Sequence, residues 1–550
     1  MDSDRFARLC EIPPVEIADP PPRRLDSESE ARAWVQALPR ANPQQTQTRL
    51  RGMLRALTAG SLPPGRRFAV LEQLRVPVLE AVALLEREFV GGSLPLPPSR
   101  ARAARDAEDF HRLLGHGYRR AAAEYCRGNG RPPLLGSVRV ARALHRAVCH
   151  YAFALMVAWR VYRQPGGSIW AGLHRSFWFG EQLGLCDRAI EDPRYGGRVC
   201  ARSLYIKTLI TALANPSSYS QGEQVELGEL AAAYADQCPL SLQRRCEQCL
   251  PVPVAEDHPP GIDREAHDGP WLDLARLDAA IAGVLASGDQ TVLELSPRRG
   301  VHVRVSREML VRLRRSLARP AERDFPRLDA GHLVEAVIGL SSLHYFLAGG
   351  LDFDNFVRRC VAVFPQSADR AVWAHGAGEN SRVPVLPARV LDQSLGGYGL
   401  SWQSNMQVRA RVGELLGLTF AGAGERGVDW MVGLIRWLRH GDNGEVVAGI
   451  ELLARRAHAV GLQVNAEDGK PRPLVRAIEL EHLDTVGERC FLISNEFQLD
   501  RDRVEVVRSR ESDPLEDEQA LAPTNLKLHE FSRAGEYVAL CGTPWEPVPG

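Results

Sequence analysis

Apolar residues recur at helical spacing through the first half of the chain. One stripe repeats every three or four positions, which places it on one face of a helix. Its members are Phe68, Leu71, Leu74, Val78, Val82, Leu85 and Phe89. Val138 to Tyr162 is apolar on almost every side, which is typical of a helix buried in a bundle. With Ser27 or Ser29 as a suitable N-cap, we expect a helical domain at residues 28–250 after a disordered tail at residues 1–27.

The pattern changes after this half. Residues 251–270 are rich in proline among polar neighbours, which predicts a linker between domains. Residues 271–320 alternate between helical and strand-like spacing, which predicts a connector or a small α/β segment. The expected elements are a helix at 272–285, short strands at 291–295 and 301–305, and a second helix at 307–317.

Strand signals dominate from about residue 321 onward. The strand-like runs are Val412–Phe420, Val428–Leu438 and Val446–Leu453. Asn443-Gly444 lies between two of them and is a strong hairpin signal, so we predict an antiparallel meander. Leu452 to Ala459 can form a closing helix. Two further β-rich runs, at 477–493 and 504–540, either continue a barrel or add a second sheet. The sequence thus predicts a multidomain α+β protein with an all-α N-terminal domain.

Gly422 to Gly427 spells GxGxxG, the spacing found in dinucleotide sites. Such a site needs a helix directly after the glycines, because the pyrophosphate binds the helix N-terminus. The residues from Asp429 to Trp437 are aromatic and β-branched, which favours a strand. We therefore predict a connection between antiparallel strands and no nicotinamide or flavin site.

Composition narrows the class of protein. The 550 residues carry 68 basic and 68 acidic side chains, so nothing predicts broad electrostatic binding to nucleic acid or to an anionic membrane. The first residues lack the apolar core of a signal peptide, and the longest apolar run, around Ala152 to Trp159, is too short to span a bilayer. We expect a cytoplasmic protein with no membrane insertion and no nucleic-acid partner.

The eleven cysteines predict mostly reduced, buried thiols. Cys246 and Cys249 form a CxxC pair, with Cys238 and His258 nearby in the sequence. Structural zinc generally needs four ligands, and no second paired motif is present. The sequence therefore predicts no metal site.

The stretch from Asp392 to Leu400 combines an acidic residue, a hydroxyl and three glycines between strand-like runs. A carboxylate accepts hydrogen bonds from the donor edge of guanine, a hydroxyl can donate or accept, and glycines leave room for a flat ligand. The alternative is a glycine-rich β-turn capped by an Asx side chain.

This stretch, DQSLGGYGL, is followed by VGELLGL, WMVGLIRWL and AGIELL. Together they resemble the PilZ domain of bacterial cyclic di-GMP receptors, over roughly Glu322 to Ala459. The resemblance implies a six-stranded antiparallel β-barrel, here with an insertion and extra C-terminal strands, within residues 321–545. It also implies two ligand motifs, RxxxR before the barrel and [D/N]xSxxG on it.

The second motif is present as Asp392, Ser394 and Gly397, and the first is matched by Arg323 and Arg327 in the setting AERDFPR. The resemblance thus implies a cyclic di-GMP site. Its predicted residues are Arg323, Arg327, Asp392, Ser394, Gly396 and Gly397. The two motifs lie further apart than is usual in the family. Either residues 340–360 hold an inserted helical element, or Arg358 and Arg359 are the ligand arginines instead.

The leading interpretation is a receptor or adaptor that couples cyclic di-GMP binding to a helical region with a protein partner. No cofactor is expected besides this ligand. The alternative is a degenerate PilZ-like interaction module that binds no nucleotide. An enzyme is the weakest interpretation, because the sequence has no Walker loop, no HExxH and no GxSxG elbow.

Overall fold

The structure is a computed structural model of the 550-residue chain. The residues that it describes are 11–14, 25–60, 62–127, 130–133, 136–195, 197–261, 269–288, 290–318, 326–361, 383–403, 408–420, 429–441, 444–464, 474–481, 489–494, 503–508, 524–534 and 537–544. They divide into two compact units, one running mainly up to residue 321 and the other from residue 322 onward. The prediction that residues 251–270 link two domains remains a prediction.

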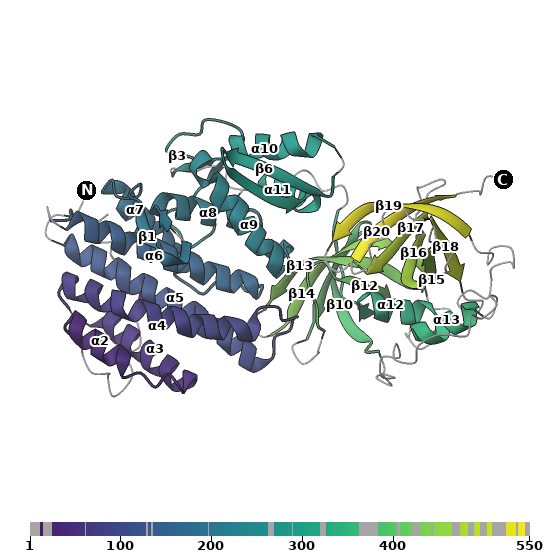
Figure 1. Cartoon of the computed structure of the whole chain (residues 1–550), viewed down its shortest axis with the longest axis horizontal. Helices are drawn as coiled ribbons and strands as arrows, with labels where there is room; N and C mark the ends of the chain where they lie inside the picture. The colour runs from purple at the N-terminus through teal and green to yellow at the C-terminus, as the bar shows by residue number, and fades with distance from the viewer. Residues whose placement is uncertain are drawn as a thin grey trace. The chain divides into compact units, whose positions relative to one another are not determined.

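The first unit begins with a bundle of helices (Figure 1). They are α2 (Glu28–Gln36), α3 (Pro43–Ala59), α4 (Pro64–Phe89), α5 (Pro98–Tyr125), α6 (Ser137–Arg160), α7 (Ile169–Gln182), α8 (Ala201–Leu213) and α9 (Gln221–Tyr234). Ser27 caps α2, since its side chain accepts a hydrogen bond from the Glu30 amide. The stripe from Phe68 to Phe89 is buried along α4, which packs against α5. The helical N-terminal domain is confirmed.

Helices α5 and α6 have buried residues along most of their lengths, and they pack against each other (Figure 1). A short hairpin of β1 (Ile190–Asp192) and β2 (Gly197–Val199) follows α7. It carries the buried Asp192 toward the helices. The aromatic ring of Phe177 on α7 stacks on Tyr205 of α8, with centroids 3.9 Å apart. The aromatic cluster around Phe177 is therefore part of the core.

Two small sheets and two helices complete the first unit. The elements are β3 (Leu240–Ser241), β4 (Cys249–Pro251), β5 (Trp271–Asp273), α10 (Ala275–Ala286), β6 (Val292–Arg298), β7 (Val301–Ser306) and α11 (Arg307–Leu317). β5 lies between β3 and β4, and β6 pairs with β7. The predicted alternation of helices and strands between residues 271 and 320 is confirmed.

The second unit contains a first barrel of antiparallel strands. Its elements are β8 (Leu328–Asp329), β9 (Leu333–Ile338), α12 (Leu340–Leu347), α13 (Phe353–Val361), β10 (Leu386–Ser394), β11 (Gly397–Trp402), β12 (Leu415–Thr419), β13 (Met431–His440) and β14 (Val446–Ala454). The strands pair in the order β11-β14-β13-β12-β9-β10, and β10 also pairs with β11, which closes the ring. β8 adds to β10 outside it. The six-stranded antiparallel barrel predicted from the resemblance is confirmed.

A second closed barrel follows the first. It is built from β15 (Arg456–Val464), β16 (Val475–Glu481), β17 (Arg489–Ser494), β18 (Arg503–Arg508), β19 (Thr524–Ala534) and β20 (Tyr537–Pro544), in the order β15-β16-β17-β20-β19-β18. The sequence left open whether these strands extend the first barrel. They form a barrel of their own, filled by side chains such as Val460, Phe491 and Leu526.

Helix α12 packs between the two barrels. Its Leu343 belongs to a core that also contains Val337 and Trp430 from the first barrel and Ile478 and Leu492 from the second. The barrels therefore share one apolar core across this helix, and they form one compact unit. The predicted inserted helical element at residues 340–360 is present as α12 and α13.

The closing helix predicted at Leu452 to Ala459 is wrong. These residues end β14 and begin β15, and β15 pairs with β16 and β18. Alanine, leucine and arginine favour a helix locally, but backbone pairing on both sides of the strand outweighs that small preference.

The hairpin prediction is confirmed, because β13 and β14 pair antiparallel up to His440 and Val446, and Gly444 adopts a φ of +82° in the turn. The glycine run at residues 422–427 lies outside the described residues. The strands before and after it, β12 and β13, are antiparallel neighbours, as predicted. None of the helices that the structure describes is long and apolar enough to cross a membrane.

Candidate functional site

The second sequence motif lies on the hairpin of β10 and β11. Asp392 and Ser394 are on β10, Gly396 is in the turn, and Gly397 starts β11. Ser394 pairs with Gly397 in the register, and its hydroxyl donates a hydrogen bond to the Gly397 carbonyl at 3.4 Å. The hairpin holds these residues at one end of the barrel strands. The hairpin backbone is therefore compatible with both interpretations of the motif, a glycine-rich turn and a ligand-binding stretch.

Two glycines of this hairpin are required by close contacts. A Cβ atom at Gly397 would lie 2.0 Å from the carbonyl oxygen of Ile450 on β14, so only glycine fits this strand pair. A Cβ atom at Gly399 would lie 2.9 Å from Oδ1 of Asp392 and 3.0 Å from Oδ2. Gly399 sits opposite Asp392 in the register and leaves room for its carboxylate. The sequence analysis did not assign Gly399 to the site, although its place in the glycine run could have suggested it.

Arg327 reaches the motif from just before β8. Its Nη1 donates to Oδ1 of Asp392 at 2.5 Å, although 65 positions separate the two residues. The backbone brings them together because Asp329 of β8 pairs with Asp392 of β10. Both side chains are partly accessible, with 36% of Arg327 and 28% of Asp392 exposed. One arginine of the first motif and the aspartate of the second thus meet at the barrel surface. Arg323 lies outside the described residues.

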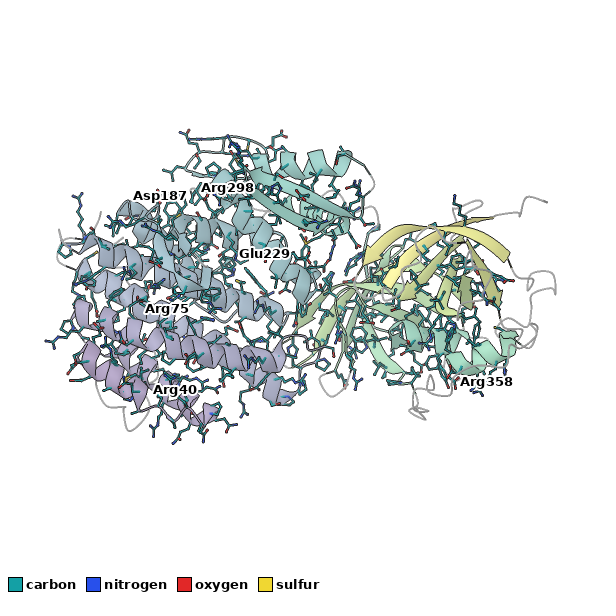
Figure 2. The ribbon with its side chains drawn as sticks, in the orientation of Figure 1. Arg40, Arg75, Asp187, Glu229, Arg298 and Arg358 are labelled. Atoms are coloured by element: carbon teal, nitrogen blue, oxygen red, sulfur yellow. The ribbon has the colours of Figure 1, made fainter. Side chains whose placement is uncertain are left out.

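The long spacing between the motifs has a structural cause. The chain between β8 and β10 forms β9 and the two helices α12 and α13, besides residues that the structure does not describe. Arg358 and Arg359 are exposed on α13, and Figure 2 shows Arg358. That helix packs through Phe356 and Cys360 against the second barrel. Arg358 and Arg359, the alternative ligand arginines, therefore lie on a helix that packs against the second barrel.

Exposed apolar residues lie close in sequence to Arg327 and Asp392. Leu328 on β8 and Leu395 in the hairpin turn are more than 60% exposed, and Leu391 on β10 is partly exposed. Leu328 is the register partner of Gln393, next to Asp392. Successive side chains on a strand point to opposite faces, so Leu328 and Gln393 share the face opposite that of Asp392. These leucines had no signal in the sequence, because their exposure depends on the strand pairing.

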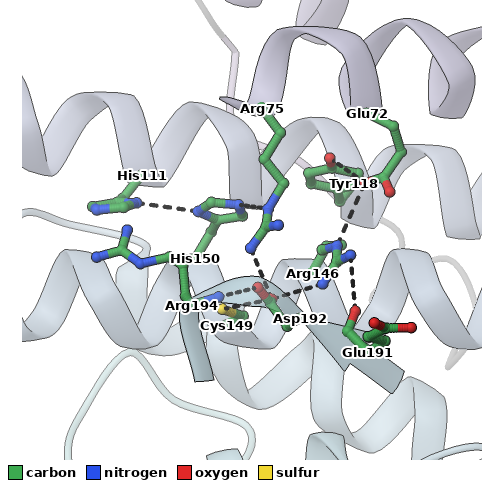
Figure 3. Close-up of polar contacts among 10 residues, drawn as sticks. All are labelled: Glu72, Arg75, His111, Tyr118, Arg146, Cys149, His150, Glu191, Asp192 and Arg194. Atoms are coloured by element: carbon green, nitrogen blue, oxygen red, sulfur yellow. Dashed lines mark hydrogen bonds and ion pairs between the residues drawn. The ribbon is translucent and has the colours of Figure 1, made fainter. Parts of the chain in front are cut away.

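A cluster of charged groups is also buried in the helical unit (Figure 3). Asp192 of β1 accepts hydrogen bonds from Arg75 at 2.8 Å and Arg146 at 2.6 Å. Arg75 also donates to His150 at 3.1 Å, and His150 lies 3.1 Å from the Nδ1 of His111. These contacts tie the β1–β2 hairpin to α4 and α6. The sequence analysis did not find this cluster, because its members are spread over more than a hundred positions.

The burial of this cluster shifts its ionisation. Burial acts to raise the pKa of Asp192, but the positive charges of Arg146 and Arg75 outweigh burial and lower it. Burial lowers the pKa of His111 and of His150 well below the ordinary histidine value, and nearby positive charges add to the effect. Both histidines are therefore neutral and Asp192 is charged. Because Asp192 pairs with two arginines, the cluster has the character of a structural network.

Comparison with known proteins gives two family matches. Residues 29–245 match the model described as the N-terminal domain of the cyclic-di-GMP receptor FimW, and residues 255–377 and 364–459 match its middle PilZ domain. The chain belongs to the PilZ-domain family. The PilZ match ends inside β15, so it contains the whole first barrel and little of the second. Both family descriptions name a cyclic-di-GMP receptor.

One curated protein is similar over most of its length. The cyclic-di-GMP receptor FimW of Pseudomonas aeruginosa is 23% identical over 520 residues, which cover 84% of this chain and 82% of that protein. No solved structure matches the chain. An alignment of this length cannot lie within one compact unit, so it extends over residues of both.

Proposed function

We propose that this chain is a receptor for cyclic di-GMP, and that the ligand binds where the two motifs meet on the first barrel. The proposed ligand residues are Arg323, Arg327, Asp392, Ser394, Gly396 and Gly397, which are the residues of the two PilZ motifs. The contact between Arg327 and Asp392 is the observation that carries the proposal. It joins groups that are distant in the sequence and that have complementary roles toward this ligand. The similarity to FimW supports the same conclusion.

The chemistry of the pair fits the ligand. Cyclic di-GMP carries phosphates, and a guanidinium group can bind a phosphate through two parallel hydrogen bonds. It also carries guanines, and a carboxylate can accept hydrogen bonds from the donor edge of guanine. Ligand binding would exchange the ion pair of Arg327 with Asp392 for contacts of each group with the ligand. An exposed ion pair of this kind contributes only about 0–1 kcal/mol, so its loss is easily offset by charge-assisted bonds to the ligand.

The readout of binding is proposed to involve the helical unit and a protein partner, in the cytoplasm. Two features support this. The relative whose alignment extends over both units is named a receptor, and the first unit has an extensive core of its own. No cofactor besides the ligand is part of the proposal, and no catalytic step is assigned.

Calorimetric titration of the full chain with cyclic di-GMP tests the proposal. We expect binding by the wild type and a loss of affinity of about tenfold or more in Arg327→Ala, because a charge-assisted hydrogen bond contributes about 1.5–3 kcal/mol. Arg327→Lys keeps the charge but loses the planar fork, and should also bind weakly. Arg323→Ala, Asp392→Ala and Ser394→Ala should each weaken binding while the fold is retained.

Arg358→Ala and Arg359→Ala are the matched controls, because they remove exposed arginines from α13. Wild-type affinity in these two variants supports the proposed site. If they abolish binding while Arg327→Ala and Arg323→Ala do not, the ligand arginines are the pair on α13. If the wild type itself gives no heat with cyclic di-GMP, the chain is an interaction module that does not bind this nucleotide.

A further inference from the structure

The small sheet of β3, β4 and β5 brings together three metal-ligand side chains. They are Cys246 and Cys249 of the CxxC pair and Asp273 of β5. The sulfur atoms and a carboxylate oxygen all lie within 4.8 Å of one another. The sequence analysis counted only the two thiols and predicted no metal. Asp273 is 27 positions from Cys246, and only the fold makes it a neighbour.

The backbone positions each of the three groups. The Cys249 amide donates to the Cys246 carbonyl at 3.4 Å, which closes a turn and turns both thiols to one side. Asp273 is the direct register partner of Cys249 across the β4–β5 pair. As a result, the two Sγ atoms are 2.8 Å apart, and the Cys246 thiol donates to Oδ1 of Asp273 at 3.4 Å.

The Asp273 carboxylate has few partners in this cluster. Within the described residues, Asp273 has no ion-pair partner, and its Oδ1 accepts only the Ala275 amide and the Cys246 thiol. Three groups that can bind a metal thus converge, and the Arg244 guanidinium near them donates to the Cys246 carbonyl at 3.3 Å. A bound cation would replace the thiol protons and stabilise the two thiolates and the carboxylate together.

We propose that Cys246, Cys249 and Asp273 bind one zinc ion, with water as the fourth ligand. Thiolate donors select a thiophilic metal, and zinc accepts two sulfur ligands and one carboxylate in tetrahedral geometry. At a zinc–sulfur distance of about 2.3 Å, two tetrahedral thiolates lie about 3.7 Å apart, so binding needs the thiols to separate by about 1 Å. Rotation of the partly exposed Cys246 side chain can supply that movement.

The ion would stabilise the small sheet of β3, β4 and β5. The strands β3, β4 and β5 have only two or three residues each, so backbone pairing contributes little to their stability. The three ligands would join the turn before β4 to β5, and Asp273 also caps the start of α10 through the Ala275 amide. Zinc would therefore fix this sheet onto α10. This role is independent of cyclic di-GMP binding.

Zinc titration of the full, reduced chain against a chromogenic chelator tests the proposal. We expect one ion per wild-type chain, and a loss of affinity of about 100-fold or more in Cys246→Ser, Cys249→Ser and Asp273→Asn, because even partners outside the ligand set change metal affinity 10–100-fold. Asp273→Asn keeps the oxygen that caps α10 and removes only the charge. Cobalt in place of zinc should give the absorption of cobalt–thiolate bonds in the wild type and lose it in Cys246→Ser.

Two control variants match the ligand changes. Cys490→Ser removes a thiol from the other close cysteine pair, 3.0 Å from Cys541, and Asp278→Asn removes a carboxylate from α10. Both should bind zinc like the wild type. Circular dichroism of Cys246→Ser should match that of the wild type in chelator. A wild type that binds no zinc, equal affinity in Cys246→Ser, or recovery of Cys246 and Cys249 as a disulfide without metal would each overturn the proposal.

Discussion

At the scale of single residues, the candidate site depends on missing side chains as much as on charged ones. Gly399 has no Cβ atom, and the carboxylate of Asp392 occupies the space that one would fill. Gly397 similarly allows β11 to approach the Ile450 carbonyl on β14. The two glycines thus have separate structural roles: Gly399 leaves room for the Asp392 carboxylate of the proposed site, and Gly397 allows the strand pairing.

Alanine at each glycine should separate these roles. Gly399→Ala displaces the Asp392 carboxylate, and we expect cyclic di-GMP affinity to fall about tenfold while the melting temperature stays near that of the wild type. Gly397→Ala forces β11 and β14 apart, and we expect the melting temperature itself to fall. Calorimetry and thermal unfolding of both variants check this. Unchanged affinity in Gly399→Ala would contradict the placement of Asp392 in the site.

At the scale of elements, the β1–β2 hairpin is attached to the helices by buried charge. Asp192 is fully buried between Arg75 and Arg146, and each partner comes from a different helix. The same carboxylate also accepts the Arg194 amide at 3.2 Å. A buried carboxylate stays ionised without a large free-energy cost only when oppositely charged partners lie next to it.

Asp192→Asn should therefore destabilise the helical unit strongly. Removing one partner from a buried charge network costs about 3–5 kcal/mol, because Arg75 loses its ion pair and Arg146 keeps only the pair with Glu72 among the described residues. The matched control is Asp278→Asn, which breaks an exposed pair with Arg314 and should cost less than about 1 kcal/mol. Urea unfolding followed by the helical circular dichroism signal measures both. Equal stabilities of the two variants would show that the buried network contributes little.

At the scale of the whole molecule, neutral buried histidines link stability to pH. Burial lowers the pKa of His145 to about 3 and that of His174 to about 4, and it lowers those of His111, His116 and His150 well below the ordinary value. In the unfolded chain these histidines take up protons near pH 6.5. The unfolded state therefore binds more protons than the folded state below about pH 6.5, so folding stability falls as the pH falls.

We expect the free energy of unfolding to be nearly constant down to about pH 7 and to decrease between about pH 6.5 and about pH 5. Each buried histidine contributes a slope of up to about 1.4 kcal/mol per pH unit. His174→Gln should reduce the slope by about one histidine, whatever its effect on stability at neutral pH, while the exposed His332→Gln should leave the slope unchanged. Urea unfolding across this pH range measures the slope, and a flat profile would contradict the burial argument.

Much of this protein follows from local sequence. The apolar stripe on α4 predicted its buried face, because residues three and four apart share one side of any helix. The Asn443-Gly444 hairpin followed from turn chemistry, and the motif residues Asp392, Ser394 and Gly397 were recognisable as a contiguous pattern. In each case the residues that carry the pattern are only a few positions apart, so their spacing in the sequence determines which of them are neighbours.

The tertiary structure decided whatever depends on distant partners. Local propensity favoured a helix at Leu452–Ala459, but pairing with strands on both sides makes it β14 and β15. Arg327 meets Asp392, and Asp273 meets Cys246, only because strand pairing joins segments far apart in the chain. The closure of the last six strands into their own barrel also depends on the pairing of β15 with β18. Sequence spacing carries no information on such contacts, since backbone pairing between distant strands creates them.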